Sequence, residues 1–214
     1  KIIEWDNEGN IVWEWNAFDH YSMEDFDLFV SWDYSVNNLA EPYDWTHFNA
    51  LFFDESSNAL YVSSRHLSRI TKIDYSSGEI IWNIGLPLRS DDLVIMPDSP
   101  FSFQHGLQVL ENGNIVTLDN GNLSHYIYPD LQSPVSRAME INITENDDDL
   151  IAQVIWAYTL DSDLYGALSG NVQKLSNGNY LITTIGGTGT TLEVTPAKEI
   201  VWECKYNLGP YVDG

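Results

Sequence analysis

Four polar residues at related positions of the chain could together transfer a group from an oxyanion. His47 and Asn49 lie two residues apart at the start of an expected strand, and strand geometry places their side chains on one face. Arg65 ends the next expected strand, and the hairpin between the two strands returns it to the side of His47. His105 opens the corresponding strand of the next repeat. A neutral imidazole is a competent nucleophile, a second imidazole can protonate a leaving oxygen, and a guanidinium binds sulfate or phosphate oxygens.

The same residues also suit a purely structural role. By repeat alignment, His47 and His105 hold nearly equivalent positions in neighbouring repeats, and residues 169–171 hold that position in the third. In the structural alternative the two histidines only bond the neighbouring backbone. The spacing alone leaves both interpretations open.

Two hairpin patterns repeat along the chain and would position these residues. The first is an alternating strand, a polar turn and a β-branched strand that ends in tryptophan, which predicts hairpins with a buried indole. Its copies end at Trp13, Trp82, Trp156 and Trp202. The second pattern occurs at 107–117 and 172–182, with a degenerate copy at 49–62. It contains an Asn-Gly pair, expected to supply the two positive-φ residues of a tight hairpin turn.

Joined together, the two patterns predict an all-β fold, a β-propeller of four-stranded antiparallel blades. The expected parts of this single partial domain are a half-blade at 1–15, an insertion at 16–43 and blades near 44–84, 104–158 and 169–204. A β-sandwich is the alternative. About three and a half blades cannot close a ring of four to eight, so absent sequence or a partner chain completes the ring, or the ring stays open. The start at Lys1, inside a strand-like pattern, suggests a piece of a longer chain or a processed product.

Composition excludes several classes of function. The 214 residues include 32 acidic and 9 basic side chains, a formal net charge of −23, which disfavours nucleic acids and anionic membranes as partners. No apolar run approaches the roughly 20 residues of a membrane span. The single Cys204 excludes a disulfide framework and a cysteine-based metal site, and we expect no metal and no cofactor. His66 and His125 are interpreted as exposed loop residues, and Arg137 as a residue that fixes a strand end or pairs with an acid.

A series of motifs, in order over roughly residues 44–204, resembles the arylsulfotransferase family. The motifs are DWTHFN at 44–49, SSRH at 63–66, QHG at 104–106, LDNG at 118–121, SR at 136–137 and GNVQKLSNGN at 170–179. The resemblance implies a six-bladed propeller in or beyond the bacterial periplasm. It also implies transfer of a sulfuryl group from an aryl sulfate donor to a phenolic acceptor, without a nucleotide donor or another cofactor.

The resemblance also implies roles for individual residues. The transiently sulfated histidine of the family falls on His105, and its H-x-N pair falls on His47 and Asn49. By similarity, Asn49 and Arg65 hold the sulfuryl and leaving oxygens, His47 assists proton transfer, and Gln104 helps to bind the substrate. A further family histidine, from an earlier blade, has no match in this chain.

Two other functions remain open from the sequence. A non-catalytic propeller that serves as a binding or assembly module of a secreted protein would keep the scaffold, and the incomplete ring and the missing histidine favour it. A quinone-dependent dehydrogenase-like propeller shares the Asp74, Gly78 and Trp82 repeat pattern but would need an adjacent cysteine pair, which the chain lacks. We expect a periplasmic or extracellular location. For partner chains, the sequence leaves open a second copy of this chain, in a homo-oligomer, or a different chain that completes the ring.

Overall fold

The computed structural model describes residues 1–25, 44–87, 90, 94–145 and 149–206, in which antiparallel strands form a half-blade and three full blades. The half-blade contains β1 (Ile2–Trp5) and β2 (Ile11–Trp15). The first blade contains β3 (Phe48–Asp54), β4 (Ala59–Ser64), β5 (Arg69–Asp74) and β6 (Ile80–Gly85). The second contains β7 (His105–Val109), β8 (Ile115–Asp119), β9 (Arg137–Glu145) and β10 (Leu150–Thr159). The third contains β11 (Gly170–Lys174), β12 (Tyr180–Thr184), β13 (Thr190–Val194) and β14 (Ile200–Lys205).

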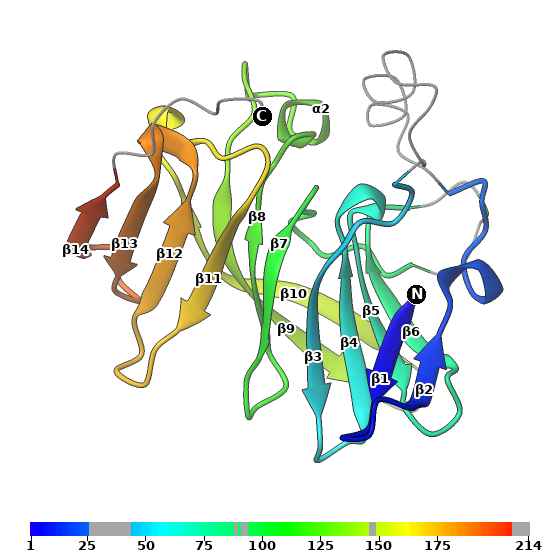
Figure 1. Cartoon of the computed structure of the whole chain (residues 1–214). Coiled ribbons are helices and arrows are strands. Elements are labelled where there is room, and N and C mark those ends of the chain that lie inside the picture. Colours follow the sequence, from blue (N-terminus) through cyan, green and yellow to red (C-terminus); the bar gives the residue numbers. More distant parts are fainter. Residues whose placement is uncertain (26–43, 88–89, 91–93, 146–148, 207–214) are drawn as a thin grey trace, which may run out of the picture.

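Each full blade pairs its strands in sequence order (Figure 1), which is the topology expected of a propeller blade. The short helices of the described chain are α2 (Ser124–Ile127) and the 3-10 turns at Ala17–Asp19, Arg65–Leu67, Ser162–Leu164 and Gly186–Thr188. Residues 26–43 of the expected insertion lie outside the described residues. No helix among the described residues is both long enough and apolar enough to span a membrane.

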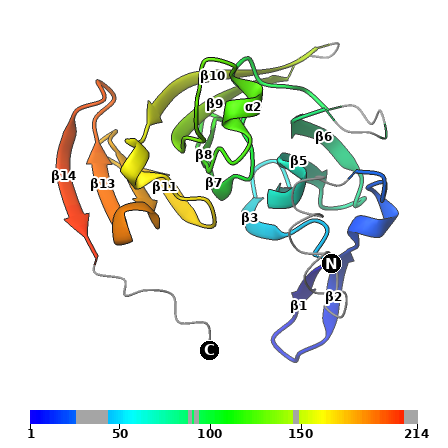
Figure 2. The ribbon, with the colours of Figure 1, turned by 90° about the horizontal axis from the view of Figure 1, so that it is seen from above.

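The blades follow one another around an arc (Figure 2), with β3, β7 and β11 as the inner strands. The sheets formed by the described residues do not close into a ring. The chain is therefore a partial β-propeller, and the predicted fold class is confirmed.

The Asn-Gly turns differ in detail from the sequence-based expectation. Gly113 and Gly178 have φ of +82° and +87°, but Asn112 and Asn177 are not in the positive-φ region. Each asparagine instead accepts a hydrogen bond through its side chain from the backbone N–H two residues later, at 3.1 and 3.0 Å. The connection is thus a longer turn in which the asparagine folds the backbone locally and the glycine alone adopts the left-handed conformation.

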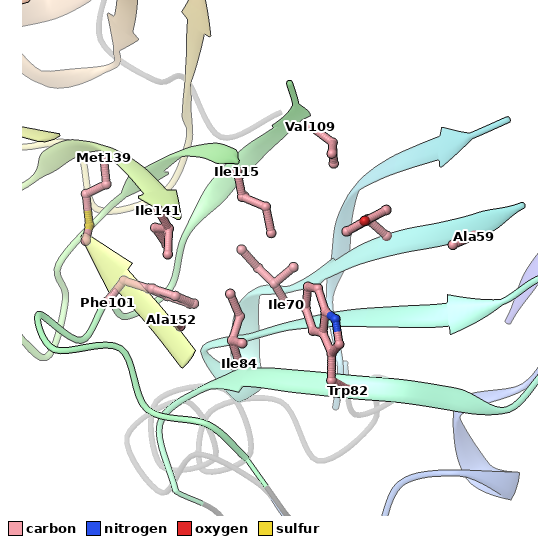
Figure 3. Packing of buried hydrophobic residues seen from close by; sticks show 11 residues of the cluster. Ala59, Ile70, Trp82, Ile84, Phe101, Val109, Ile115, Met139, Ile141 and Ala152 are labelled. Carbon is pink, nitrogen blue, oxygen red and sulfur yellow. The ribbon is translucent and has the colours of Figure 1, made fainter. Parts of the chain in front are cut away.

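Apolar side chains fill the spaces between neighbouring blades, because each sheet is buried on the faces that meet the next sheet. Figure 3 shows the cluster between the first and second blades, to which Ile70 and Ile84 contribute from one side and Phe101, Ile115 and Ile141 from the other. All five of these side chains are fully buried. The third blade joins the second through a separate cluster. Packing of this kind fixes one blade against the next, and it therefore determines which side chains at the strand ends of neighbouring blades lie close together.

The recurring tryptophans bond from blade to blade. The indole N–H groups of Trp13, Trp82 and Trp156 donate to the next blade along the chain, to Tyr75 O, Glu145 Oε1 and Pro196 O, at 2.9 to 3.0 Å. Trp82 is buried, as predicted for core packing. Trp202, on the outer strand of the third blade, is 47% exposed instead.

Candidate active site

The first blade carries His47 and Arg65 at one end. His47 directly precedes β3 and Arg65 directly follows β4, and the antiparallel pairing of Phe48 with Ser64 makes the two neighbours. The backbone N–H of Arg65 donates to the carbonyl of His47 at 3.1 Å. His47 has φ of +48°, an unfavourable conformation for a residue with a side chain, and the bonds around it hold this local strain.

The second blade brings His105 to the same place. His105 begins β7, and the centroid of its ring lies 6.5 Å from that of His47, with the ring planes at 72°. The imidazole is largely buried, with 8% of the residue exposed. Its Nδ1 lies 2.8 Å from Oδ1 of Asn120, the residue that follows β8. The two histidines of the predicted site therefore face each other across the boundary between two blades.

Arg65 links these residues to the third blade. Only 7% of the residue is exposed, and its guanidinium carbon lies 4.8 Å from the centre of the Phe103 ring. Nη2 donates to the carbonyl of Ala167 at 3.0 Å, in the segment that leads to β11. The cation is thus held by an aromatic face and by a backbone carbonyl, which fixes its position next to the imidazoles.

The surroundings of His105 keep its ring neutral. Burial lowers the pKa of His105 below its ordinary value, and the positive charges of Arg65 and His47 lower it further. The hydrogen bond to Asn120 acts in the opposite direction without cancelling the shift. Because the neutral ring has a lone pair on one nitrogen, this environment favours the form that can act as a nucleophile.

Asn49 and Gln104 take up positions that support the histidines. The Nδ2 of Asn49 donates to the carbonyl of Gln104 at 2.7 Å, so this amide holds the backbone directly before His105. The side chain of Gln104 is fully buried, and its Nε2 lies at hydrogen-bond distance from Ser63 Oγ and Arg69 O. These bonds hold the second blade against the first. Direct substrate contact by Asn49 or Gln104 stays a prediction, and the bonds assign Gln104 a structural role.

A comparison with known families places the chain in one of them. Residues 1–207 match the family model described as Arylsulfotransferase (ASST), nearly the whole chain. The chain belongs to the arylsulfotransferase family. The resemblance noted from the motifs is thereby confirmed.

Two solved structures are similar to this chain. One is a protein of unknown function from Bacteroides caccae, with 14% identity, a TM-score of 0.47, and coverage of 76% of this chain and 47% of that one. The other is the β-propeller domain of Cps50 (Swd1) from Myceliophteria thermophila, with 14% identity, a TM-score of 0.46, and coverage of 89% and 48%. This chain thus spans about half the length of both structures. No curated protein matches the sequence.

His66 is not the exposed loop residue that its sequence context suggested. It is only 5% exposed, its ring centroid lies 4.5 Å from that of His47, and its Nδ1 lies 2.5 Å from the carbonyl of Asp44. The interpretation was wrong because the 3-10 turn Arg65–Leu67 tucks the side chain under the loop that carries His47. Burial lowers the pKa of His66 to about 4, so this ring is neutral at physiological pH.

Asp44 forms a group with His47 and His66. Donor atoms of Asp44, His47 and His66 lie within 4.8 Å of one another, a spacing that a metal ion could bridge. However, the Asp44 carboxylate pairs with Nδ1 of His47, and the Asp44 carbonyl with Nδ1 of His66. These hydrogen bonds account for the clustering. Their consequence for the chemistry is that Asp44 orients the ring of His47.

Two residues of the site escaped the analysis of the sequence. Asp44 lies in the DWTHFN motif and Asn120 in the LDNG motif, so both were within the resemblance without an assigned role. Their positions in these motifs were the signal that could have identified them as site residues. The carboxylate of Asp44 pairs with His47 inside the same motif, whereas the side chain of Asn120 bonds residues from other parts of the chain, which no local pattern contains.

Proposed function

We propose that this chain forms the sulfuryl-transfer site of an aryl-sulfate sulfotransferase, in which His105 carries the sulfuryl group between an aryl sulfate and a phenol. The observation that carries the proposal is a neutral, largely buried imidazole with a second imidazole 6.5 Å away and a fixed guanidinium beside both. Membership of the arylsulfotransferase family supports the same class of donor and acceptor. A periplasmic or extracellular location is part of this proposal, since the family resemblance implies it.

The first step transfers the group to the protein. A ring nitrogen of His105 attacks sulfur, the N–S bond forms, and the bond between sulfur and the aryl oxygen breaks. The leaving phenolate takes a proton from the imidazolium form of His47, whose other nitrogen pairs with the Asp44 carboxylate. Arg65 stabilises the charge that develops on the sulfuryl oxygens, and such positioning is the main requirement of a loose in-line transfer.

The second step reverses the first with a different phenol. Neutral His47 accepts the proton of the acceptor hydroxyl, the phenol oxygen attacks sulfur, and the N–S bond breaks. His105 returns to its neutral form and His47 to its protonated form, so both steps balance in protons and charge. The carboxylate of Asp44 pairs with Nδ1 of His47 and keeps the ring oriented for this proton transfer.

The test is a search for the covalent intermediate. Incubation of the chain with 4-nitrophenyl sulfate, without acceptor, should release nitrophenolate and add the mass of one sulfuryl group to the peptide that contains His105. Addition of phenol should remove this mass. A His105→Ala variant should show neither event, and a His125→Ala variant, altered in the helix α2, should behave as the wild type. A wild-type protein that folds but forms no adduct would favour the non-catalytic binding propeller.

A further inference from the structure

We infer that Asn120 is a positioning residue that holds the proton of His105 on Nδ1 and thereby leaves Nε2 as the nitrogen that takes the sulfuryl group. The inference rests on the proposed function for its consequence, but the protonation state itself is a property of the resting protein. It starts from the 2.8 Å contact between His105 Nδ1 and Asn120 Oδ1.

The orientation of the Asn120 amide follows from its other partners. Its Nδ2 donates to the carbonyl of Gly166 at 2.5 Å and to the carbonyl of Ser169 at 3.1 Å. Carbonyl oxygens only accept, so the NH₂ group must face these two residues and Oδ1 must face His105. An amide oxygen has no hydrogen to give. The hydrogen bond to Oδ1 therefore requires that Nδ1 of His105 carries the proton.

Asn120 is rigidly held, as a residue that sets a tautomer must be. It is fully buried, and its own carbonyl accepts a hydrogen bond from Ser136 Oγ at 2.9 Å. The preceding Asp119 forms an ion pair with Arg137 at 2.6 Å and accepts from the backbone N–H of Ser102 at 2.9 Å. This pair confirms the role expected of Arg137 at a strand end.

The following glycine restricts the turn on the other side. Gly121 has φ of +69°, and a Cβ on it would lie 1.8 Å from the carbonyl oxygen of Val135. Asn120 is thus fixed between an ion pair and a close backbone approach. Neither its backbone nor its amide can turn without loss of several hydrogen bonds in a buried region.

A neutral His105 with the proton on Nδ1 has its lone pair on Nε2, on the side of the ring away from Asn120. When Nε2 attacks sulfur, the N–S bond forms, the sulfur–oxygen bond to the aryl group breaks, and the Nδ1 proton stays in place. The ring becomes cationic in this step, so its hydrogen bond to Oδ1 becomes charge-assisted and stronger. Asn120 therefore selects the attacking nitrogen and also stabilises the charge that the attack creates.

The amide also couples two parts of the site. Gly166 and Ser169, its acceptors, flank Ala167, whose carbonyl accepts from Arg65. One side chain thus fixes the nucleophile in the second blade and the segment of the third blade on which Arg65 rests. Loss of the amide would disturb both, which is why a test must separate the tautomer from the packing.

The experiment measures the tautomer directly, by ¹⁵N NMR of histidine-labelled protein at a pH where His105 is neutral, with His105→Ala used to assign the signals. In the wild type we expect a protonated Nδ1 and an unprotonated Nε2. Asn120→Asp keeps an oxygen acceptor for Nδ1 but loses the NH₂ donor to Gly166 O and Ser169 O, so it should keep Nδ1 protonated while it disturbs the packing. Asn120→Ala loses both functions and should lose the protonation of Nδ1 in part or completely. The control is Asn114→Ala, because Asn114 is also a buried asparagine next to β8, at its other end, where it bonds Glu140.

Activity then links the tautomer to transfer. Asn120→Ala should lower kcat/KM for 4-nitrophenyl sulfate about 10- to 100-fold, as expected for loss of a partner that orients a reacting imidazole, and Asn114→Ala should not. A wild-type His105 protonated on Nε2 would overturn the inference without any variant. So would an Asn120→Ala protein with an unchanged tautomer and unchanged adduct formation. If the tautomer is as expected but no adduct forms, the proposed function fails and the placement of the proton by Asn120 stands.

Discussion

Replacement of Arg65 by alanine should slow sulfuryl transfer strongly. The change deletes the guanidinium that lies 4.8 Å from the Phe103 ring and its 3.0 Å hydrogen bond to Ala167 O. Loss of one fixed donor aimed at developing negative charge typically costs 10²–10³-fold in kcat, or about 3–4 kcal/mol of transition-state stabilisation. Arg65→Lys keeps a positive charge but loses the planar fork, so we expect only partial recovery of the rate.

The same substitution should change the pH profile. The positive charge of Arg65 contributes, after burial, to the low pKa of His105. Without that charge the pKa of His105 rises, and the ring becomes protonated at a higher pH. Since only the neutral ring attacks sulfur, the acid limb of kcat/KM should move to higher pH in Arg65→Ala and less far in Arg65→Lys.

The assay is release of nitrophenolate from 4-nitrophenyl sulfate across a pH series, with circular dichroism to establish that each variant is folded. Lys205→Ala is the control, because it also removes one positive charge, from a side chain that is 63% exposed and pairs only with Glu203 among the described ion pairs. A folded Arg65→Ala protein with the wild-type rate and the wild-type pH profile would refute the placement of Arg65 in the site.

Two further predictions concern stability. Burial lowers the pKa of His66 to about 4, so folding favours its neutral ring. The contribution of this ring to the free energy of unfolding is complete above the unfolded-state pKa near 6.5. It falls as the pH drops towards 4, by up to about 3 kcal/mol. Urea denaturation between these pH values should show the loss, His66→Phe should flatten it, and an equal slope in both proteins would contradict the assignment. Trp156→Phe removes the indole bond to Pro196 O and should lower the free energy of unfolding by about 1 kcal/mol. Trp202→Phe should cost less, because that side chain is 47% exposed, and equal losses would show that the blade-to-blade bond contributes nothing.

The strand order could be predicted from the sequence because each blade repeats the same local pattern. Alternation of apolar residues, the glycine turns and the terminal tryptophan are all local signals, and they predict the four-stranded antiparallel blades that the structure contains as β3–β6, β7–β10 and β11–β14. The convergence of His47, Arg65 and His105 also followed, since equivalent positions of neighbouring blades meet at one end of the inner strands. The turn type could not be predicted from the Asn-Gly motif. The motif predicts a positive φ at Asn112, whereas in the structure its side chain accepts a hydrogen bond from the backbone two residues later.

The partners of the histidines could not be predicted in the same way. Burial of His66 depends on how one short 3-10 turn packs under the neighbouring loop, and the bond from His105 to Asn120 spans 15 residues and two strands. The bonds of Asn120 to Gly166 and Ser169 join different blades. Such contacts depend on the distance and angle between neighbouring sheets. Packing of the apolar clusters between the blades sets both quantities, and the sequence of a single repeat does not reveal them.

The chemistry of the site therefore depends on the interfaces between blades rather than on any one blade. His47 and Arg65 belong to the first blade, His105 and Asn120 to the second, and the carbonyls that hold Arg65 and Asn120 lead into the third. A shift between two sheets would leave each hairpin intact and still separate His105, the proposed nucleophile, from the guanidinium of Arg65. The fully buried residues between the blades, such as Ile84 and Ile115, thus contribute to the proposed transfer through position, because they hold in register the strand ends that carry the polar side chains.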